Sequence, residues 1–369
     1  MRILIVNAGS SSLKLRVLGP GDAVASSADL LAPRGPAPRD TAALAEALEG
    51  FGPVDAVGHR VVHGGTQFSG PVVVTGDVRR RLEQLTDLAP LHQPKSLAAL
   101  DAVGRVLPRI PAVACFDTAF HASIPAAAAT FALPHEWRTR WTLRRYGFHG
   151  LSHSYVSRRA ATMASPGASE FRVVTCHLGA GASLAAVQGG RSVDTTMGFT
   201  PLDGLVMATR SGSVDPGLVL WLEEHAGMPP GELAATLENR SGLLGLAGTA
   251  DMREVLSRAA SGDERAVVAR DVYLHRLRAS VAAMVAAMDG LDALVFTGGV
   301  GENSAEIRSR AGGSLGFLGV GIDDARNAGG GGDDYEISAD GAAVRAFVIA
   351  AREDLEIAAQ VRAVLSGKG

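Results

Sequence analysis

The 369-residue chain has little cysteine, few aromatic residues and no marked excess of charge of either sign. Its two cysteines, Cys115 and Cys176, lie far apart in apolar runs typical of strands. They predict reduced core residues in a cytoplasmic environment and do not indicate a disulfide framework. The formal net charge of −3 offers no electrostatic case for a nucleic acid or an anionic membrane as a partner.

Long apolar stretches are also absent. The longest apolar helical run, 279–288, is too short to span a bilayer. The first residues enter a strand pattern without a charged and then apolar leader, which predicts no secretory signal. Hydrophobic residues nevertheless make up 47% of the chain, and its length favours two medium domains.

Apolar strand patterns alternate with helical patterns along the chain, which predicts an α/β fold. Strands are expected at 2–6, 15–18, 56–62, 112–116, 173–177, 184–187 and 293–296. Helices are expected at 41–48, 95–106, 152–163, 217–224, 264–287 and 353–365. The helix at 264–287 carries alanine and valine on one face and is expected to pack centrally. The glycine run 329–332 predicts a surface loop.

The opening segment, 3–18, is a strand, a turn of small polar residues and a second strand. The turn offers three hydroxyls, an amide and a lysine, the donors that a polyphosphate needs, but not the residue order of a Walker A loop. An ordinary hairpin turn remains the alternative. The same order recurs at 172–190 and predicts two related lobes that hold a nucleotide between two such hairpins, unless the similarity of two short hairpins is due to chance.

Two arginines predict an anion site. Arg60 lies in GHRVVHGG, where a strand ends in polar groups, and it suits either a clamp on phosphate or carboxylate or a structural ion pair. Arg210 precedes Ser-Gly-Ser in a glycine-rich loop and is the expected second arginine if a phosphoryl group lies between the two.

Two further candidate site residues, Asp117 and His149, lie next to a strand or to glycines. Asp117 comes directly after an apolar strand, where it can hold Mg²⁺, orient an arginine, act as a base, or simply cap a helix. His149 lies between Gly147 and Gly150, which we interpret as a close backbone approach to a ligand, with a core histidine as the alternative. The glycines of 298–301 would let the chain lie flat against an adenine or a ribose.

Taken together, these segments resemble the acetate kinase family of acetate, propionate and butyrate kinases, within the sugar-kinase/actin/heat-shock ATPase superfamily. The resemblance rests on NAGSSSLK, GHRVVHGG, LAPLHQP, FDTAFH, YGFHGLSH, HLGAGAS, TTMGFTPLDGL, TRSGSVDP, TGGVGENS and AREDLEIA, in the family's order over essentially the whole chain. It implies two ribonuclease-H-like lobes with mixed sheets flanked by helices and an active-site cleft between them. The lobes are expected at 1–120 with the C-terminal helix 354–369, and at 121–353 with the adenosine site.

The resemblance also implies roles for individual residues. Those that bind ATP or ADP would be Asn7, Ser10, Ser12, Lys14, His177, Gly179, Gly181, Asp251, Arg253, Gly299, Gly301, Glu302 and Asn303. The catalytic residues would be Asp117, His149, Arg210 and Arg60, with Arg60 also holding acetyl phosphate. The small acyl pocket would be formed by Val62, Leu91, Phe148 and Pro201. Mg²⁺, or Mn²⁺, would be associated with Asn7 and Glu353. The family further implies a homodimer.

The nucleophile of such a reaction is a carboxylate, which is ionised at neutral pH and needs no general base. Asp117 is therefore better suited to position a metal or an arginine than to act as a base. In-line phosphoryl transfer then depends on alignment and charge stabilisation.

The chain departs from the family pattern in three places. Ala180 and Gln93 each replace an asparagine, and Ala351-Arg352-Glu353-Asp354 replaces Thr-Asn-Glu-Glu, which places the positive charge of Arg352 beside Glu353. These departures bear on nucleotide and metal affinity more than on the type of reaction. We therefore consider an acetate kinase first. A propionate or other short-chain acyl kinase and a nucleotide-binding homologue with impaired catalysis are the alternatives.

Overall fold

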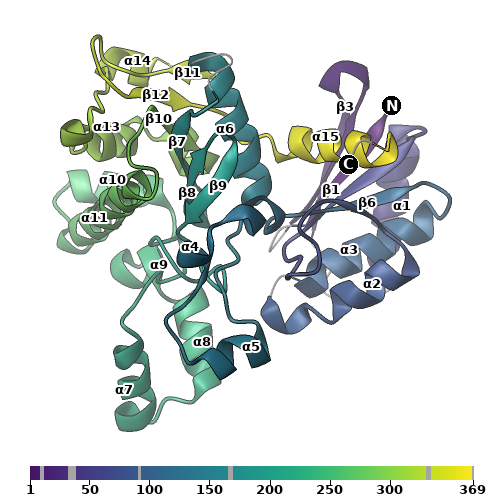
Figure 1. The fold of residues 1–369 in the computed structure, drawn as a ribbon, viewed down its shortest axis with the longest axis horizontal. Coiled ribbons are helices and arrows are strands. Elements are labelled where there is room, and N and C mark those ends of the chain that lie inside the picture. The colour runs from purple at the N-terminus through teal and green to yellow at the C-terminus, as the bar shows by residue number, and fades with distance from the viewer. Residues whose placement is uncertain (9–11, 32–38, 90–92, 165–168, 330–333, 368–369) are drawn as a thin grey trace. The chain divides into compact units, whose positions relative to one another are not determined.

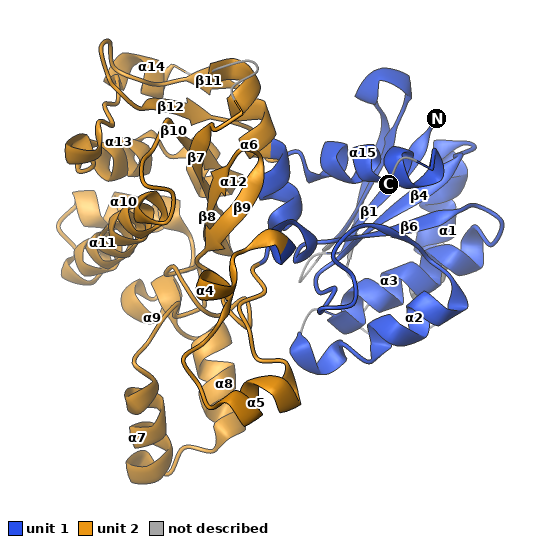
Figure 2. Ribbon diagram, in the orientation of Figure 1, with its two compact units in different colours: residues 1–122, 148–155, 352–369 blue, residues 123–147, 156–351 orange. Residues whose placement is uncertain are grey.

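A computed structural model describes residues 1–8, 12–31, 39–89, 93–164, 169–329 and 334–367 (Figure 1). The chain divides into two compact units (Figure 2). Unit 1 contains Met1–Ala122, Phe148–Tyr155 and Arg352–Gly369, and unit 2 contains Ser123–Gly147 and Val156–Ala351. The predicted division into functional lobes at residues 120 and 354 stays a prediction.

The sheet of unit 1 has the strand order β3-β2-β1-β4-β6-β5. Its strands are β1 (Ile3–Ala8), β2 (Ser12–Leu18), β3 (Val24–Leu31), β4 (Ala56–Val61), β5 (Val72–Val73) and β6 (Ala112–Phe116). Strands β1, β4 and β6 are parallel, and the other three pair antiparallel. The helices that lie within this unit are α1 (Arg39–Phe51), α2 (Gly76–Glu83), α3 (Gln93–Val106) and α15 (Glu353–Leu365).

Helices cover both faces of this sheet, and β1 supplies core residues to each of them. Leu4 and Val6 belong to the cluster that includes α1 and α3, whereas Ile3 and Ile5 belong to the cluster that includes α15. This alternation follows from the two-residue repeat of a strand. A Cβ at Gly58 would lie 2.4 Å from Ile357 of α15, so the contact between β4 and α15 requires a glycine.

The sheet of unit 2 repeats this arrangement. Its order is β11-β12-β10-β7-β8-β9, with the same succession of parallel and antiparallel pairs. The strands are β7 (Arg172–Leu178), β8 (Ala182–Gln188), β9 (Arg191–Thr195), β10 (Ala293–Thr297), β11 (Tyr335–Glu336) and β12 (Arg345–Val348). The two sheets therefore correspond strand for strand, which confirms the prediction of two related lobes.

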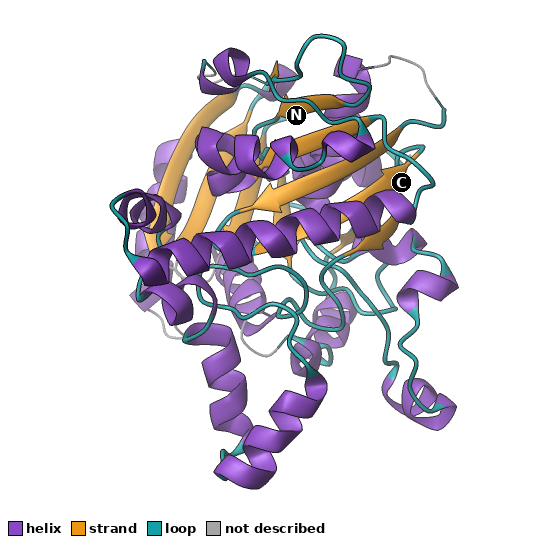
Figure 3. Ribbon diagram, turned by 90° about the vertical axis from the view of Figure 1, so that its left-hand side faces the viewer, coloured by secondary structure: helices purple, strands orange, loops and turns teal. Residues whose placement is uncertain are grey.

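Helices lie over the sheet of unit 2 as well, and α11 packs against β7 and β8 (Figure 3). Helix α6 (Gly150–Ala164) begins in unit 1 and ends in unit 2. The helices wholly in unit 2 are α4 (Ala126–Ala129), α5 (His135–Trp141), α7 (Pro216–Ala226), α8 (Pro230–Asn239), α9 (Gly242–Ala247), α10 (Met252–Ala260), α11 (Glu264–Ala286), α12 (Gly298–Asn303), α13 (Ala305–Gly313) and α14 (Asp324–Ala328).

Each helix and strand predicted above is present, and the strand at 112–116 and the helix at 353–365 have the predicted bounds. The strands β3, β5, β9, β11 and β12 were not predicted. Strands β3 and β9 are edge strands that contain serine and aspartate, so their sequences lack the apolar pattern of a buried strand. Strands β5, β11 and β12 are only two to four residues long. Cys115 and Cys176 are buried and unpaired, as predicted. Most of the predicted glycine loop lies outside the described residues.

No helix in the described part of the chain is both long enough and apolar enough to cross a membrane.

The burial of His59, His63 and His121 in unit 1 makes the stability of the fold depend on pH. Burial lowers the pKa of His59, His63 and His121 to about 4, with Asp101 opposing the effect at His59 and the Phe148 carbonyl opposing it at His121. The unfolded chain binds these protons near pH 6.5, whereas the folded chain resists them down to about pH 4.

We therefore expect the free energy of unfolding to fall as the pH is lowered through this window, by up to about 1.4 kcal/mol per pH unit for each histidine. Urea unfolding at about pH 7.5, 6 and 5 measures the slope. His59→Leu should flatten it, and His225→Gln, at an exposed position, should not. A free energy that stays constant over this range would contradict the expectation.

Candidate active site

Polar residues of unit 1 gather at one edge of its sheet. Asn7 lies near the end of β1, Arg60 near the end of β4, and Asp117 directly after β6. These three strands are parallel neighbours, so their carboxyl ends meet at the same edge, where open α/β sheets bind ligands.

Arg60 and Asp117 form the central ion pair of this edge. The Arg60 Nε donates to both carboxylate oxygens of Asp117 at 3.1 and 3.2 Å, and its Nη2 donates to Oδ2 at 2.6 Å. The side chains are only 15% and 2% exposed. Of the alternatives for Asp117, these hydrogen bonds support orientation of an arginine.

The environment of the pair keeps Arg60 charged. Burial acts against its charge, but Asp117 and Glu353 outweigh burial, so the pKa of the guanidinium lies above its ordinary value. Burial also disfavours the charged form of Asp117 and so raises the pKa of its carboxyl. Arg60 and the backbone N–H of His149 oppose this effect. Because a buried charge is costly unless it is paired, each side chain requires the other.

Asn7 and Glu353 complete the site. The Asn7 Oδ1 accepts from Arg60 Nη1 at 3.2 Å, and the Asn7 Nδ2 donates to Glu353 Oε2 at 2.9 Å. Glu353 Oε2 also lies 4.0 Å from Arg60 Nε. Residues from β1, β4, the end of β6 and the first turn of α15 therefore form one connected network in unit 1.

Glu353, Asp117 and Asn7 present only oxygen atoms as possible metal ligands. Among the described residues, no group of three or more histidine, cysteine, aspartate or glutamate residues is arranged to hold a metal ion. Mg²⁺ commonly takes one or two carboxylates and completes its coordination with water and substrate phosphates. The donor set around Glu353 fits that pattern and does not fit a site built entirely from protein ligands.

His149 lies at the start of α6 with a left-handed backbone, φ +56°. The flanking Gly150 has a structural explanation that differs from the predicted approach to a ligand. Its N–H donates to the Asp117 carbonyl at 2.9 Å, and a Cβ there would lie 2.1 Å from that oxygen. His121 Nε2 holds the same turn through the Phe148 carbonyl at 3.0 Å. The turn that carries His149 is thus bound tightly to Asp117.

Two of the predicted acyl-pocket residues, Val62 and Phe148, are buried in unit 1, whereas Leu91 lies outside the described residues. Gln93, one of the departures from the family pattern, is fully buried. Its side-chain amide pairs with the backbone N–H and carbonyl of His63, as a neighbouring peptide group would. Its Oε1 accepts from His63 N–H at 3.2 Å and its Nε2 donates to His63 O at 3.1 Å. Gln93 therefore supports the segment next to Val62.

The first hairpin is described only in part. Ser10 lies outside the described residues, and Ser12 begins β2, with its side chain undescribed. Lys14 is exposed on β2 and pairs in register with Asn7 of β1. The strands on either side of the turn are thus antiparallel neighbours, as predicted, while its phosphate-binding role stays a prediction.

In unit 2, two glycine turns lie side by side after the neighbouring parallel strands β7 and β10. A Cβ built at Gly179 would lie 4.0 Å from Gly299 N and 3.8 Å from His177 Nε2. The Gly179 N–H donates to the Gly181 carbonyl at 3.0 Å, which closes the first turn. A Cβ at Gly299 would meet nothing within 4 Å, so protein packing does not require this glycine.

Glycines 298 and 301 differ from Gly299 in that they are packing residues. A Cβ at Gly298 would lie 2.9 Å from the Leu178 carbonyl, and one at Gly301 would lie 3.3 Å from the carbonyl carbon of Phe296. Of these three glycines, only Gly299 leaves room for a ligand to approach the backbone.

The remaining predicted adenosine residues bind to the protein itself. Asn303 Nδ2 donates to the Gly299 carbonyl at 2.9 Å, and Glu302 Oε1 accepts from Gly298 N–H at 2.9 Å. Asp251 caps α10 and forms an ion pair with Arg253, an interaction that lowers the pKa of Asp251 to about 2. The nucleotide role of Asp251 and Arg253 stays a prediction.

Arg210 lies in a loop of unit 2 that its side chain helps to hold. Its Nη1 donates to the carbonyl of the buried Pro201 at 2.6 Å, so two predicted site residues are joined directly. Burial lowers the pKa of Arg210, and Glu238, 3.9 Å away on α8, opposes this effect. Sequence reasoning missed Glu238, because nothing in the pattern around it indicates a contact with Arg210.

Arg145 was also missed. Its Nη1 donates to the carbonyls of Thr195, Thr196 and Met197, at 3.1, 3.1 and 3.2 Å. It holds the start of the segment that leads to Pro201. A lone arginine in a basic stretch carries no sequence signal for this role.

Two departures from the family pattern have local explanations. Arg352 pairs with Asp354, at 2.9 and 3.0 Å, and not with the neighbouring Glu353. Although burial opposes it, Arg352 and Arg16 together lower the pKa of Asp354. The added positive charge is therefore compensated within α15. Ala180 is exposed, and its carbonyl accepts from Ala208 N–H at 3.1 Å.

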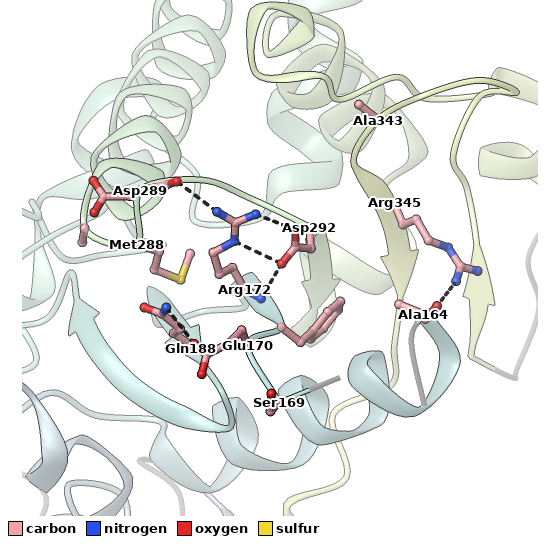
Figure 4. A pocket seen from close by; sticks show the side chains of 12 residues that line it. Ala164, Ser169, Glu170, Arg172, Gln188, Met288, Asp289, Asp292, Ala343 and Arg345 are labelled. Carbon is pink, nitrogen blue, oxygen red and sulfur yellow. Dashed lines mark hydrogen bonds and ion pairs between the residues drawn. The ribbon is translucent and has the colours of Figure 1, made fainter. Parts of the chain in front are cut away.

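A hollow of about 860 Å³ lies at the opposite edge of the unit 2 sheet, where β7 and β12 begin (Figure 4). Its two arginines are held by neighbouring groups. Arg172 is paired with Asp292 at 2.8 Å, and Arg345 Nη1 donates to the Ala164 carbonyl at 2.8 Å. The hollow is at the amino ends of the parallel strands, away from the glycine turns, and we do not assign it to the chemistry.

The fold and the carboxyl edges of the two sheets define a class of protein. The chain is an α/β protein of two related units, with charged side chains at the carboxyl edge of one sheet and open glycine turns at the same edge of the other. Within that class, the chain belongs to the acetokinase family, whose model matches residues 42–359.

Individual relatives agree with this assignment. An acetate kinase of Synechococcus sp. (strain JA-2-3B'a(2-13)) is 49% identical over 85% of this chain and 78% of its own. An acetate kinase of Leifsonia xyli subsp. xyli is 44% identical over 99% of both chains.

Solved structures show the same similarity. The crystal structure of Porphyromonas gingivalis acetate kinase matches with a TM-score of 0.90 at 36% identity, over 99% of both chains. A propionate kinase from Francisella tularensis matches with a TM-score of 0.87, also at 36% identity, over 97% of this chain and 98% of that one.

The contrast between Gly150 and Gly299 can be tested. Gly150→Ala forces a Cβ against the Asp117 carbonyl and should lower the free energy of unfolding by at least about 2 kcal/mol. Gly299→Ala meets no atom and should change it by less than about 0.5 kcal/mol. Urea unfolding measures both. Equal stability of the two variants would contradict the placement of Gly150 against Asp117.

Proposed function

We propose that the chain is an acetate kinase that catalyses the reversible transfer of the γ-phosphoryl group of ATP to acetate, giving acetyl phosphate and ADP. The observation that carries the proposal is the Arg60 network at the carboxyl edge of the unit 1 sheet, in a chain of the acetokinase family. Arg60 is charged, oriented and partly exposed, as an arginine that binds a phosphoryl group or a carboxylate must be.

The chemistry needs little from the protein beyond placement and charge. A carboxylate oxygen of acetate attacks the γ-phosphorus, and the bond from phosphorus to the ADP oxygen breaks. Acetate is already ionised at neutral pH, so no base has to remove a proton. Asp117 therefore acts by orienting Arg60. Arg60, Arg210 and His149 would stabilise the charge on the transferring group.

The nucleotide would be bound by the glycine turns of unit 2 and the polar turn after β1. Gly299 supports this proposal, because protein packing leaves space above it. Mg²⁺ or Mn²⁺, held through Glu353 and associated with Asn7, would neutralise charge on the phosphates when bound. The chain's own contribution is the orientation of Glu353 by Asn7.

Acetate and propionate differ by one methylene, which a hydrophobic pocket distinguishes by only about 1–3 kcal/mol. Val62 is buried and directly follows β4, the strand that carries Arg60. Its branched side chain favours the smaller acid. We therefore propose acetate as the preferred substrate, with propionate as a slower alternative.

A hydroxamate assay for acyl phosphate tests these proposals, with acetate, propionate and butyrate at equal concentration. We expect the rate to fall in that order. His149→Ala and Arg210→Ala should each lower kcat by about 10²–10³, because each removes a group that stabilises the transition state.

Arg240→Ala is the matched control for the Arg210 variant, since Arg240 is exposed and lies at the end of α8. It should retain the rate of the unmodified protein. Binding of ATP without product from any acid would support the impaired homologue instead, and near-normal kcat in either active-site variant would contradict the placement of the phosphoryl site.

We also propose that the chain is cytoplasmic and forms a homodimer. The two buried, unpaired cysteines suit a reducing compartment. Helix α7 supports the dimer, because it is largely apolar and none of its residues is buried. Leu220 and Trp221 of this helix are 58% and 53% exposed.

Sedimentation velocity of the full chain tests the assembly. The unmodified protein should sediment as a dimer, and Leu220→Lys should shift it toward the monomer by placing a charge in an apolar interface. Glu224→Lys, at another exposed position of the same helix, is the control and should remain dimeric. A monomeric unmodified protein at micromolar concentration would exclude the proposal.

A further inference from the structure

The segment 349–351 joins β12 to α15, and each of its amides is held from a different part of unit 2. Ile349 N–H donates to the Phe296 carbonyl of β10 at 3.1 Å. Ala350 N–H donates to Asp334 Oδ1 at 3.1 Å. Ala351 N–H donates to Glu302 Oε1, on α12, at 2.9 Å. We refer to 349–351 as the connector.

Glu302 binds a second amide with the same oxygen. Its Oε1 also accepts from Gly298 N–H at 2.9 Å. Gly298 has φ +76°, and a Cβ there would lie 2.9 Å from the Leu178 carbonyl, so the turn is fixed from its other side. One carboxylate oxygen therefore joins the Gly298 turn to the connector.

Each end of this bridge leads to a different part of the site. Gly298 precedes Gly299, the glycine whose surroundings leave room for a ligand. Ala351 lies two residues before Glu353, which begins α15 and binds Asn7. The Glu302 side chain therefore links the Gly298 turn to Ala351, two residues before Glu353.

We propose that Glu302 is a positioning residue that couples the nucleotide turn at Gly298–Gly299 to the connector that precedes α15. The nucleotide part of this inference rests on the proposed function; the bridge itself rests on the two hydrogen bonds. Glu302 acts here through the backbone. A direct contact between its carboxylate and the nucleotide is the competing role.

The chain offers variants that separate these roles. Both hydrogen bonds use an oxygen acceptor. A glutamine Oε1, like a carboxylate oxygen, can accept two hydrogen bonds. Glu302→Gln therefore retains the bridge and loses the charge, whereas Glu302→Ala loses both. Glu306→Ala is the control: Glu306 is exposed on α13, where it pairs with Arg310.

Hydrogen exchange of the full chain, followed by mass spectrometry with and without ADP, measures the bridge directly. In Glu302→Ala the peptides containing Gly298 and Ala351 should exchange at least about 10-fold faster without ADP, because their amides lose their acceptor. In the unmodified protein ADP should protect both the turn and the connector. In Glu302→Ala any protection by ADP should be confined to the turn. Glu302→Gln and Glu306→Ala should exchange as the unmodified protein does.

Unchanged exchange at Ala351 in Glu302→Ala would overturn the inference. Loss of ADP protection in Glu302→Gln, with normal exchange in its absence, would also overturn it in favour of direct contact by the charge. If ADP failed to bind the unmodified protein, the proposed function would fail, while the exchange rates without ADP would still decide whether Glu302 holds the connector.

Discussion

A guanidinium that is largely removed from water needs acceptors on most of its edge, and Arg60 imposes this requirement on unit 1. Asp117 supplies two oxygens, Asn7 a third, and Glu353 lies nearby. Each acceptor comes from a different element, so β1, β4, β6 and α15 must all be in register for the charge to be compensated. The carboxyl edge of the sheet and the core therefore depend on each other, because misplacing any of these elements would leave a buried charge unpaired.

The two units have the same sheet topology but differ in what lies at the carboxyl edge of the sheet. In unit 1 the carboxyl edge carries charged side chains. The glycine at position 150 allows the backbone to pack closely against Asp117. In unit 2 the same edge carries backbone turns, with Gly179 and Gly299 side by side. Charged side chains suit a small anion, whereas a turn without side chains lets a ligand approach the backbone. Duplication of one fold thus provides two edges of different chemistry.

Much of the fold could be predicted because its central strands are buried on both faces and read as continuous apolar runs. The edge strands β3 and β9 escaped prediction for the opposite reason, and β5, β11 and β12 escaped it because they are too short to show a pattern. The motifs predicted functional roles for Arg60, Asp117, Glu353 and Arg210, and these roles stay predictions. They did not reveal why Gly150 is a glycine, that Glu238 faces Arg210, or that Glu302 bonds to Ala351, 49 residues further along the chain. Those contacts join segments that are distant in sequence.

The sequence by itself determined the class of fold, the internal duplication and the family, because these depend on local patterns of polarity and on motifs of adjacent residues. The tertiary structure decided which partner each charged group has. Arg352 pairs with Asp354 and leaves Glu353 to Asn7, although Glu353 is its neighbour in the chain. The physical reason is that hydrogen bonds and ion pairs act over about 3 Å, and only folding brings their partners within that distance.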